Sequence, residues 1–293
     1  MKPSLSENAA RAAFTLAAWV CLALLLFVVL FIATEALPAF QSTDPAELLL
    51  SSSWQPIGFT GEPSFGIANF VAATLLVSAL ALAFASLIGV GTALFLSFIA
   101  PRGVRGVSLA AIEMLAGIPS VVYGFVGITL VVPVFLKAGV HTGTCVLAAS
   151  LVLAIMIAPY LVSTLCDSLA KRKERYLDAA LSLGIDRWDA IATIILPTSA
   201  KSITVAMLLA WGRAMGETMA VMMVIGNANL FPRLLGKAET IPALIALEMG
   251  GAQADSAHYH ALYAAAFVLV CALLAINVAG NLVKSRFEKS GVL

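Results

Sequence analysis

The chain consists of long apolar segments separated by shorter polar ones. A helix that crosses a membrane needs about 20 mostly apolar residues. Six segments are long enough, at roughly 12–34, 68–99, 107–136, 143–166, 201–226 and 260–284. The second and third exceed one crossing, so we expect a tilt or a break in each, and Gly117 and Pro119 supply a break in the third. The pattern predicts an all-α membrane protein with six transmembrane helices.

The first apolar segment is longer than the ~7–15 apolar residues of a secretory signal, so we expect it to be retained as a membrane helix. Residues 35–66 are rich in Ser, Pro and Gly, which predicts an irregular loop. Within the loop 227–259, the apolar piece from Ile241 to Met249 is too short to cross a membrane. We expect a re-entrant or interfacial helix there.

Lysine and arginine residues fall mainly on one side of this arrangement. Of the 17 basic residues, one side holds 13, the other holds only Lys137, Arg233 and Lys237, and Arg213 lies inside a segment. Basic residues concentrate in cytoplasmic loops of membrane proteins. The distribution therefore predicts that both termini and the loop 167–200 are cytoplasmic.

Composition supports the same class. Hydrophobic residues make up 61% of the chain and charged residues 11%, whereas soluble domains carry about 25% charged residues. The net charge of +1 gives no indication of nucleic-acid binding. No histidine pairs with a cysteine at zinc spacing, so we expect no metal site. We interpret the cysteines as small buried apolar residues: Cys21, Cys145, Cys166 and Cys271.

A polar island separates the fourth and fifth apolar segments. Asp178, Ala179 and Ala180 are expected to begin a helix, and Gly184 to turn the chain. A second short helix is then capped by Asp186 and closed by Pro197. Such a knob could fit a cleft in a partner, and the alternative is an amphipathic loop on the membrane surface.

The spacing D-A-A-x3-G-x9-I-x-L-P from Asp178 to Pro197 resembles the EAA loop of binding-protein-dependent ABC-importer permeases, with Asp178 where that family usually has Glu. The resemblance implies the type I ABC-importer permease fold. It also implies a coupling helix that docks on a separate ATP-binding subunit through Asp178, Ala179, Ala180, Gly184 and Pro197. The sequence has no G-x-x-x-x-G-K-[ST] phosphate loop. We therefore expect no enzymatic activity and no cofactor on this chain, with ATP and Mg²⁺ on the partner ATPase.

Two further segments resemble the phosphate-specific members of that family. Residues 113–124 resemble their third-span signature, and 212–221 resemble the fifth span of the PstC type. The resemblance implies a phosphate importer in the plasma (inner) membrane of a prokaryote. Its other parts would be a PstA-type sister permease, two copies of an ATP-binding subunit and an extracytoplasmic phosphate-binding protein.

The resemblance covers about residues 68 to 285, and the N-terminal 67 residues match it more weakly. We accordingly expect three parts: an N-terminal helix with an outer loop at 1–67, a permease core at 68–285, and a cytoplasmic tail at 286–293.

Arg213 is the outstanding charge inside an apolar segment. It lies 12 residues after Lys201 and 14 before Asn227, so it is roughly 18–21 Å from each end of a continuous helix. An arginine at that depth costs about 2.5–3.5 kcal/mol on insertion scales. Glu217 would lie one turn away on the same face. We predict that Arg213, Glu217 and Thr218 line an anion path; the alternative is a self-neutralising pair that only stabilises packing.

Glu113 has two interpretations, a structural pair with Arg105 or a contribution to the path. Gly117, Pro119 and Gly124 either allow helices to approach or unwind beside the path, or form a fixed hinge.

Other functions remain as alternatives. A permease could carry another oxyanion, such as molybdate, tungstate or phosphonate. An intramembrane enzyme would need a nucleophile–base pair or metal ligands within the helices, where the ionisable residues are Arg213, Glu217 and Glu113. The coupling loop argues against a channel.

Overall fold

The computed structural model describes residues 5–57 and 63–289. Within them, six helical segments are long and apolar enough to cross a membrane: Arg11–Ser42, Ala68–Ile99, Ser120–Lys137, Val146–Ser182, Arg187–Met215 and Ala257–Gly280. This confirms the predicted six-helix membrane architecture. Three of the segments contain a π-helical turn, two of them being η1 (Phe95–Ile99) after α3 (Ala68–Leu94) and η3 (Ala190–Ile195) before α9 (Leu196–Met215).

The elements follow the chain in a simple order. Two short strands, β1 (Trp54–Gln55) and β2 (Ser64–Phe65), pair antiparallel. The remaining helical elements are α1 (Leu5–Ser42), α2 (Pro45–Leu50), α4 (Arg102–Ala116), α5 (Ser120–Val126), the π-helical turn η2 (Gly127–Val131), α6 (Val132–Lys137), α7 (Val146–Ser182), α8 (Arg187–Asp189), α10 (Met219–Ile225), α11 (Ile241–Glu248) and α12 (Ala257–Lys289).

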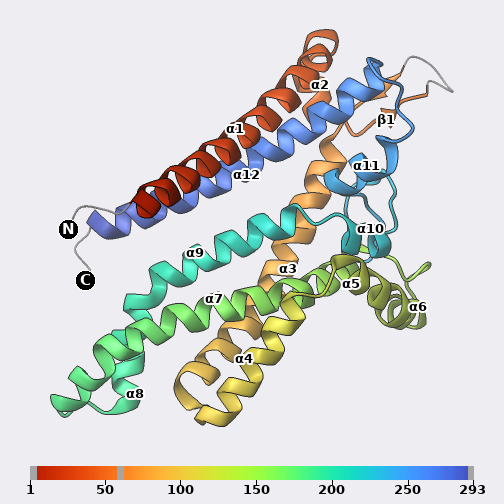
Figure 1. The fold of residues 1–293 in the computed structure, drawn as a ribbon. Helices are drawn as coiled ribbons and strands as arrows, with labels where there is room; N and C mark the ends of the chain where they lie inside the picture. Colours follow the sequence, from red (N-terminus) through yellow and green to blue (C-terminus); the bar gives the residue numbers. More distant parts are fainter. Residues whose placement is uncertain (1–4, 58–62, 290–293) are drawn as a thin grey trace.

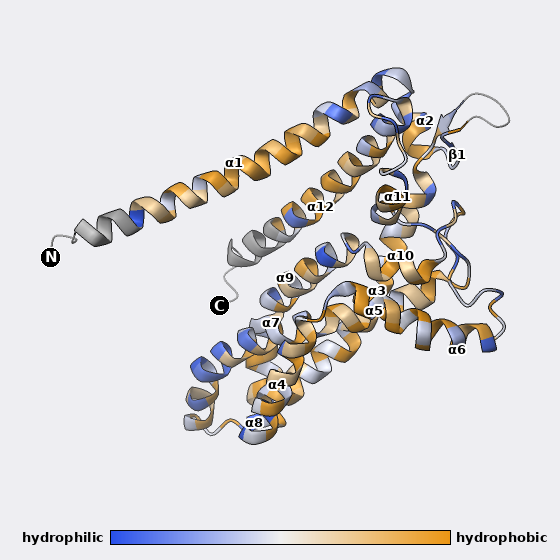
Figure 2. Ribbon diagram, turned by 45° about the vertical axis from the view of Figure 1, so that its right-hand side comes forward, coloured by the Kyte–Doolittle hydropathy of each residue, from blue (hydrophilic) through white to orange (hydrophobic). Residues whose placement is uncertain are grey.

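The centre of the molecule is α7, which packs against α3, α4, α9 and α10. Small residues such as Ala148, Ala149 and Ala154 are almost completely buried along it, so neighbouring helices approach closely. α1 runs beside α12, away from this central bundle (Figure 1). Its apolar side chains are largely exposed, and the ribbon of α1 is mostly orange, that is hydrophobic, in Figure 2. A surface of that kind suits lipid or a second membrane subunit.

The helices place their ends on two sides. The first turn of α1, the last turn of α12 and the α7–α8 turn lie at one end, and α2, β1 and α11 lie at the other (Figure 1). The end with α8 is also where hydrophilic residues gather on α7 (Figure 2). Both ends of the described chain and the α7–α8 turn thus lie at the same end of the molecule, and the side of the membrane that this end faces stays a prediction.

The predicted irregular loop 35–66 is wrong for its first half. α1 continues to Ser42 with Pro38 inside it, and α2 follows. The continuation is stabilised because Ala36 and Ala39 are buried against Ala264 of α12, and packing of this kind overrides the local preference of proline. Residues 58–62 of the predicted loop lie outside the described residues.

Two membrane segments are interrupted. The predicted break at Gly117 and Pro119 is confirmed, since α4 ends at Ala116 and α5 begins at Ser120. The fifth segment contains a break that we did not predict, because α9 ends at Met215 and α10 begins only at Met219. The short apolar piece in the loop 227–259 forms α11, whose first four residues are buried.

Candidate translocation site and coupling segment

The break in the fifth segment contains two of the predicted path residues. Glu217 and Thr218 lie in the link between α9 and α10, and Arg213 lies in the last turn of α9. A Glu217 carboxylate oxygen accepts a hydrogen bond of 3.2 Å from the backbone N–H of Ala220, so it satisfies a free donor at the start of α10. The carboxylate is thus part of the break itself.

The expected pair between Arg213 and Glu217 does not form. Both residues belong to the described part of the chain, and no ion pair joins them there. The expectation assumed a continuous helix, in which residues four apart share a face, and the break removes that relationship. The self-neutralising pair is therefore contradicted.

Arg213 instead contacts an aromatic ring. Its guanidinium carbon lies 5.4 Å from the ring centroid of Tyr160 on α7, a cation–π contact. Nearby on α5, the Tyr123 hydroxyl donates a 2.8 Å hydrogen bond to the carbonyl of Leu115 at the end of α4. Arg213 is exposed in the isolated chain. Its planar fork of N–H donors is therefore presented without a carboxylate partner.

Gly124 allows the two interrupted membrane segments, the third and the fifth, to pack closely against each other. A Cβ on Gly124 of α5 would lie 2.6 Å from the Met223 sulfur and 3.1 Å from the Ala220 Cα of α10, so only glycine allows this approach. The contact lies just beyond both breaks, Gly117–Pro119 and Gly216–Thr218. The structure thus shows Gly124 allowing a close approach, and Gly117 and Pro119 ending and starting helices.

Glu113 takes no part in this arrangement. It is exposed on α4, and no ion pair joins it to Arg105 within the described residues. The predicted structural pair is therefore wrong. Sequence reasoning also missed Tyr160 and Tyr123, because aromatic residues in apolar segments give no signal that distinguishes them from core residues.

The coupling segment differs from the prediction in where its helices begin. Asp178, Ala179 and Ala180 do not start a helix; they lie in the last two turns of α7, which runs unbroken from Val146. The predicted turn is confirmed, since Gly184 follows α7 with φ +79°. The predicted cap is confirmed too, because an Asp186 carboxylate oxygen accepts a 2.9 Å hydrogen bond from the N–H of Trp188.

Pro197 does not close the segment after Gly184. It is the second residue of α9 and directly follows the π-helical turn η3, a local adjustment that lets a helix tolerate proline. α8, η3 and α9 therefore form one continuous helical rod from Arg187 to Met215. Arg213 therefore lies near one end of the rod, and the Gly184 turn precedes its other end.

Two cations anchor the coupling segment to the end of the second membrane segment. Lys173 Nζ donates a 2.7 Å hydrogen bond to the carbonyl of Ser97, and an Arg187 guanidinium nitrogen donates to the carbonyl of Phe98. Both carbonyls lie in η1, where a helix ends and leaves acceptors unsatisfied. The turn thus has a fixed position relative to α3. Its large apolar side chains are exposed, and they are Leu181, Leu183 and Trp188.

The described residues contain no cluster of three or more His, Cys, Asp or Glu side chains that could hold a metal ion. Cys145 and Cys166 are buried as expected, whereas Cys21 and Cys271 are exposed on the isolated chain.

Known proteins support the family indicated by these features. "Probable ABC transporter permease protein YqgH" of Bacillus subtilis (strain 168) is 32% identical over 272 residues, covering 91% of this chain and 87% of that protein. "Phosphate transport system permease protein PstC" of Xylella fastidiosa (strain Temecula1) is 34% identical over 260 residues, covering 82% and 78%.

A solved structure shows the same fold. The chain is similar to a chain of the inward-facing MetNI methionine ABC transporter, with a TM-score of 0.57 at 17% identity, over 73% of this chain and 92% of that one. This likeness confirms the type I ABC-importer permease fold. The family described as "Binding-protein-dependent transport system inner membrane component" matches residues 85–290, and this chain belongs to that family.

Proposed function

We propose that this chain is the PstC-type membrane subunit of an ATP-driven importer of inorganic phosphate. The observation that carries the proposal is Arg213, which sits at the break of the fifth membrane segment against the Tyr160 ring and without a carboxylate partner. An arginine placed there at a cost of a few kcal/mol needs an anion to offset its charge. Relatives of 30–34% identity that are named phosphate permeases support the choice of anion.

Arginine suits phosphate because its planar fork donates two parallel hydrogen bonds and keeps its charge at any working pH. Glu217 holds the start of α10 in place, so it fixes the geometry of the break beside Arg213. Thr218 adds a hydroxyl in the same link. In this scheme the three residues form the anion path, with Arg213 as its binding group and Glu217 as a positioning residue.

The assembly would contain a homologous PstA-type permease, two copies of an ATP-binding subunit and an extracytoplasmic phosphate-binding protein. The exposed Leu183 and Trp188 beside Gly184 would dock on the ATPase, which holds ATP and Mg²⁺, while this chain binds no cofactor and catalyses no reaction. Both termini and the coupling segment would be cytoplasmic in the plasma membrane of a prokaryote. Closure of the ATPases would move the rod from Arg187 to Met215, and with it Arg213, which switches access between the two sides.

The second candidate is a permease for another oxyanion, such as molybdate, tungstate or phosphonate, because the same arginine fork would bind any of them. Reconstituted complex in proteoliposomes, supplied with ATP inside and labelled phosphate with the binding protein outside, tests the choice. We expect ATP-dependent phosphate uptake that an equal concentration of molybdate, tungstate or phosphonate does not reduce. Absence of phosphate uptake, or stronger competition by one of these anions, would contradict the proposal.

A further inference from the structure

A groove between α7 and α9 opens at the end of the molecule that carries the coupling segment. One cavity of about 670 Å³ and an adjoining one of about 320 Å³ are lined by the same stretch of α7, from Thr164 to Arg172, and by Ser202 of α9. Their size is that of ligand pockets, which occupy about 300–1,000 Å³.

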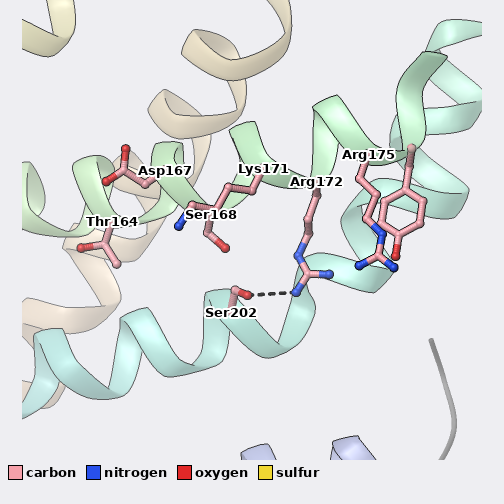
Figure 3. Close-up of a pocket in the computed structure, with 8 residues that line it drawn as sticks. Thr164, Asp167, Ser168, Lys171, Arg172, Arg175 and Ser202 are labelled. Atoms are coloured by element: carbon pink, nitrogen blue, oxygen red, sulfur yellow. Dashed lines mark hydrogen bonds between the residues drawn. The ribbon is translucent and has the colours of Figure 1, made fainter. Parts of the chain in front are cut away.

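The lining of the larger cavity is basic and rich in hydroxyls. Lys171, Arg172 and Arg175 supply three cations against one carboxylate, Asp167. Within the described chain Asp167 forms no ion pair with any of them. In Figure 3 Arg172 points across the groove and donates a 3.1 Å hydrogen bond to the Ser202 hydroxyl, whereas Asp167 lies on the side of α7 away from Ser202. The positive charge is thus directed into the groove.

Arg213 and Tyr160 belong to the same two helices that line the groove. On α7, Tyr160, Thr164, Ser168 and Arg172 follow one another at intervals of four residues, so each side chain neighbours the next one along the helix. On α9, spacings of four, three and four residues place Ser202 on the same face as Arg213, through Ala206 and Leu209. Because Arg213 contacts Tyr160, the two faces meet at both ends. Arg213 therefore lies along the same two helices as the cavities, about one turn of α7 beyond Thr164.

We propose that this groove binds a phosphate-type anion and forms the inner half of the route, through which the anion leaves Arg213. The inference rests on the proposed function, since it takes Arg213 to lie on the path. Cations and hydroxyl donors beside one another are the groups that bind phosphate oxygens, and a second basic site draws the anion off the first by electrostatic attraction. A phospholipid headgroup has the same chemistry and could occupy the groove from the membrane side.

Chemical modification of a cysteine in the groove tests the inference without requiring transport. Ser168→Cys would be made in a chain whose four natural cysteines are replaced by serine. Ser168 is chosen because it lines both cavities, and its substitution leaves the Arg172–Ser202 hydrogen bond intact. The matched control is Ala200→Cys, an exposed position near the same end of α9 but on another face. Reconstitution in zwitterionic lipid excludes anionic headgroups.

We expect Ser168→Cys to react about tenfold faster with an anionic sulfonate thiosulfonate reagent than with a cationic trimethylammonium one, because clefts of one charge concentrate ions of the opposite sign. Arg172→Gln should reduce that preference several-fold. Millimolar inorganic phosphate should slow the reaction at Ser168→Cys and leave Ala200→Cys unchanged.

Equal reaction rates with both reagents, or no protection by phosphate, would overturn the inference. Protection that appears only when phosphatidylglycerol is added would assign the groove to lipid and would overturn it too. These outcomes are separable from those of the proposed function. Phosphate uptake by the wild-type complex without protection would contradict the groove alone, whereas protection in a complex that takes up no phosphate would contradict the route.

Discussion

The Arg213 guanidinium carbon lies 5.4 Å from the centre of the Tyr160 ring. A cation–π contact of this kind contributes about 0.5–2 kcal/mol, depending on how far it is shielded from water. It orients the arginine without cancelling its charge, because the nearest acidic residue along the chain, Glu217, binds the start of α10 instead. The contact therefore holds an uncancelled positive charge at the break between α9 and α10, where we propose that the anion binds.

Replacing that group should abolish transport. We expect Arg213→Gln to reduce the rate of phosphate uptake at least about tenfold, because a hydrogen bond to a charged group contributes about 1.5–3 kcal/mol. The uptake rate of Arg213→Lys should lie between those of wild type and Arg213→Gln, because lysine keeps the charge and loses the planar fork of donors. Assembly and ATP hydrolysis should persist, because removing an intramembrane charge eases insertion. The measurement is labelled-phosphate uptake beside ATPase activity; wild-type uptake by Arg213→Gln would place the anion path elsewhere.

The aromatic partner provides a second, independent variant pair. Tyr160→Phe keeps the ring under Arg213 and should retain most of the uptake. Tyr160→Leu removes the ring and should raise the KM for phosphate while changing the assembly of the complex little. Equal KM values for the two variants would show that the ring has no part in placing Arg213.

Gly184 should be essential for coupling rather than for folding. Gly184→Asp places a side chain at φ +79°, which costs about 1–2 kcal/mol, and puts a charge beside the exposed Leu183 and Trp188. We expect ATP-driven uptake to be lost and binding of the ATPase to weaken. Gly139→Asp is a matched control, because Gly139 has φ +90° and equally open surroundings. If both variants lost uptake, backbone strain and not the loss of a docking contact would be the cause.

Much of the architecture could be predicted from the sequence because a bilayer imposes a length on apolar segments. The six segments, the break at Gly117–Pro119 and the turn at Gly184 follow from such local signals. The Asp186 cap also follows from such a signal, whereas the coupling role of the segment from Asp178 to Pro197 stays a prediction.

The errors arise where long-range contacts override local signals. Pro38 and Pro197 both suggest helix ends, yet α1 continues because Ala36 and Ala39 pack on α12, and a π-helical turn leads directly into α9. The break after Met215 removed the expected Arg213–Glu217 pair. Residues four apart share a helix face only where the helix is continuous. Gly216 is the one local residue that indicates a break at this position.

The orientation of the chain is testable by labelling from outside intact cells. A cysteine at exposed Ala254, between α11 and α12, should react with a membrane-impermeant reagent, and one at exposed Ser182, at the end of α7, should not. The expectation follows from the concentration of basic residues at the α8 end. Both sites should react after the cells are permeabilised, which controls for accessibility. Labelling of Ser182→Cys from outside would reverse the orientation and contradict docking on a cytoplasmic ATPase.

Glu239 should make stability depend on pH. It is only 7% exposed in the link before α11, and burial, with a smaller effect from the Glu248 charge, raises its pKa from 4.5 to about 7. Glu248 in turn is bound by the Trp54 indole N–H and by His258, at 2.9 and 2.7 Å. Because the raised pKa belongs to the folded state, that state binds the proton more tightly, and stability falls as the pH rises from about 4.5 to about 7. A shift of that size corresponds to about 3 kcal/mol.

Thermal unfolding of wild type and Glu239→Gln between pH 5 and 8 measures the effect: wild type should lose stability relative to the variant as the pH rises. Glu47→Gln, at an exposed position on α2, should follow wild type throughout. Parallel curves for wild type and Glu239→Gln would show that the Glu239 carboxyl does not titrate in this range.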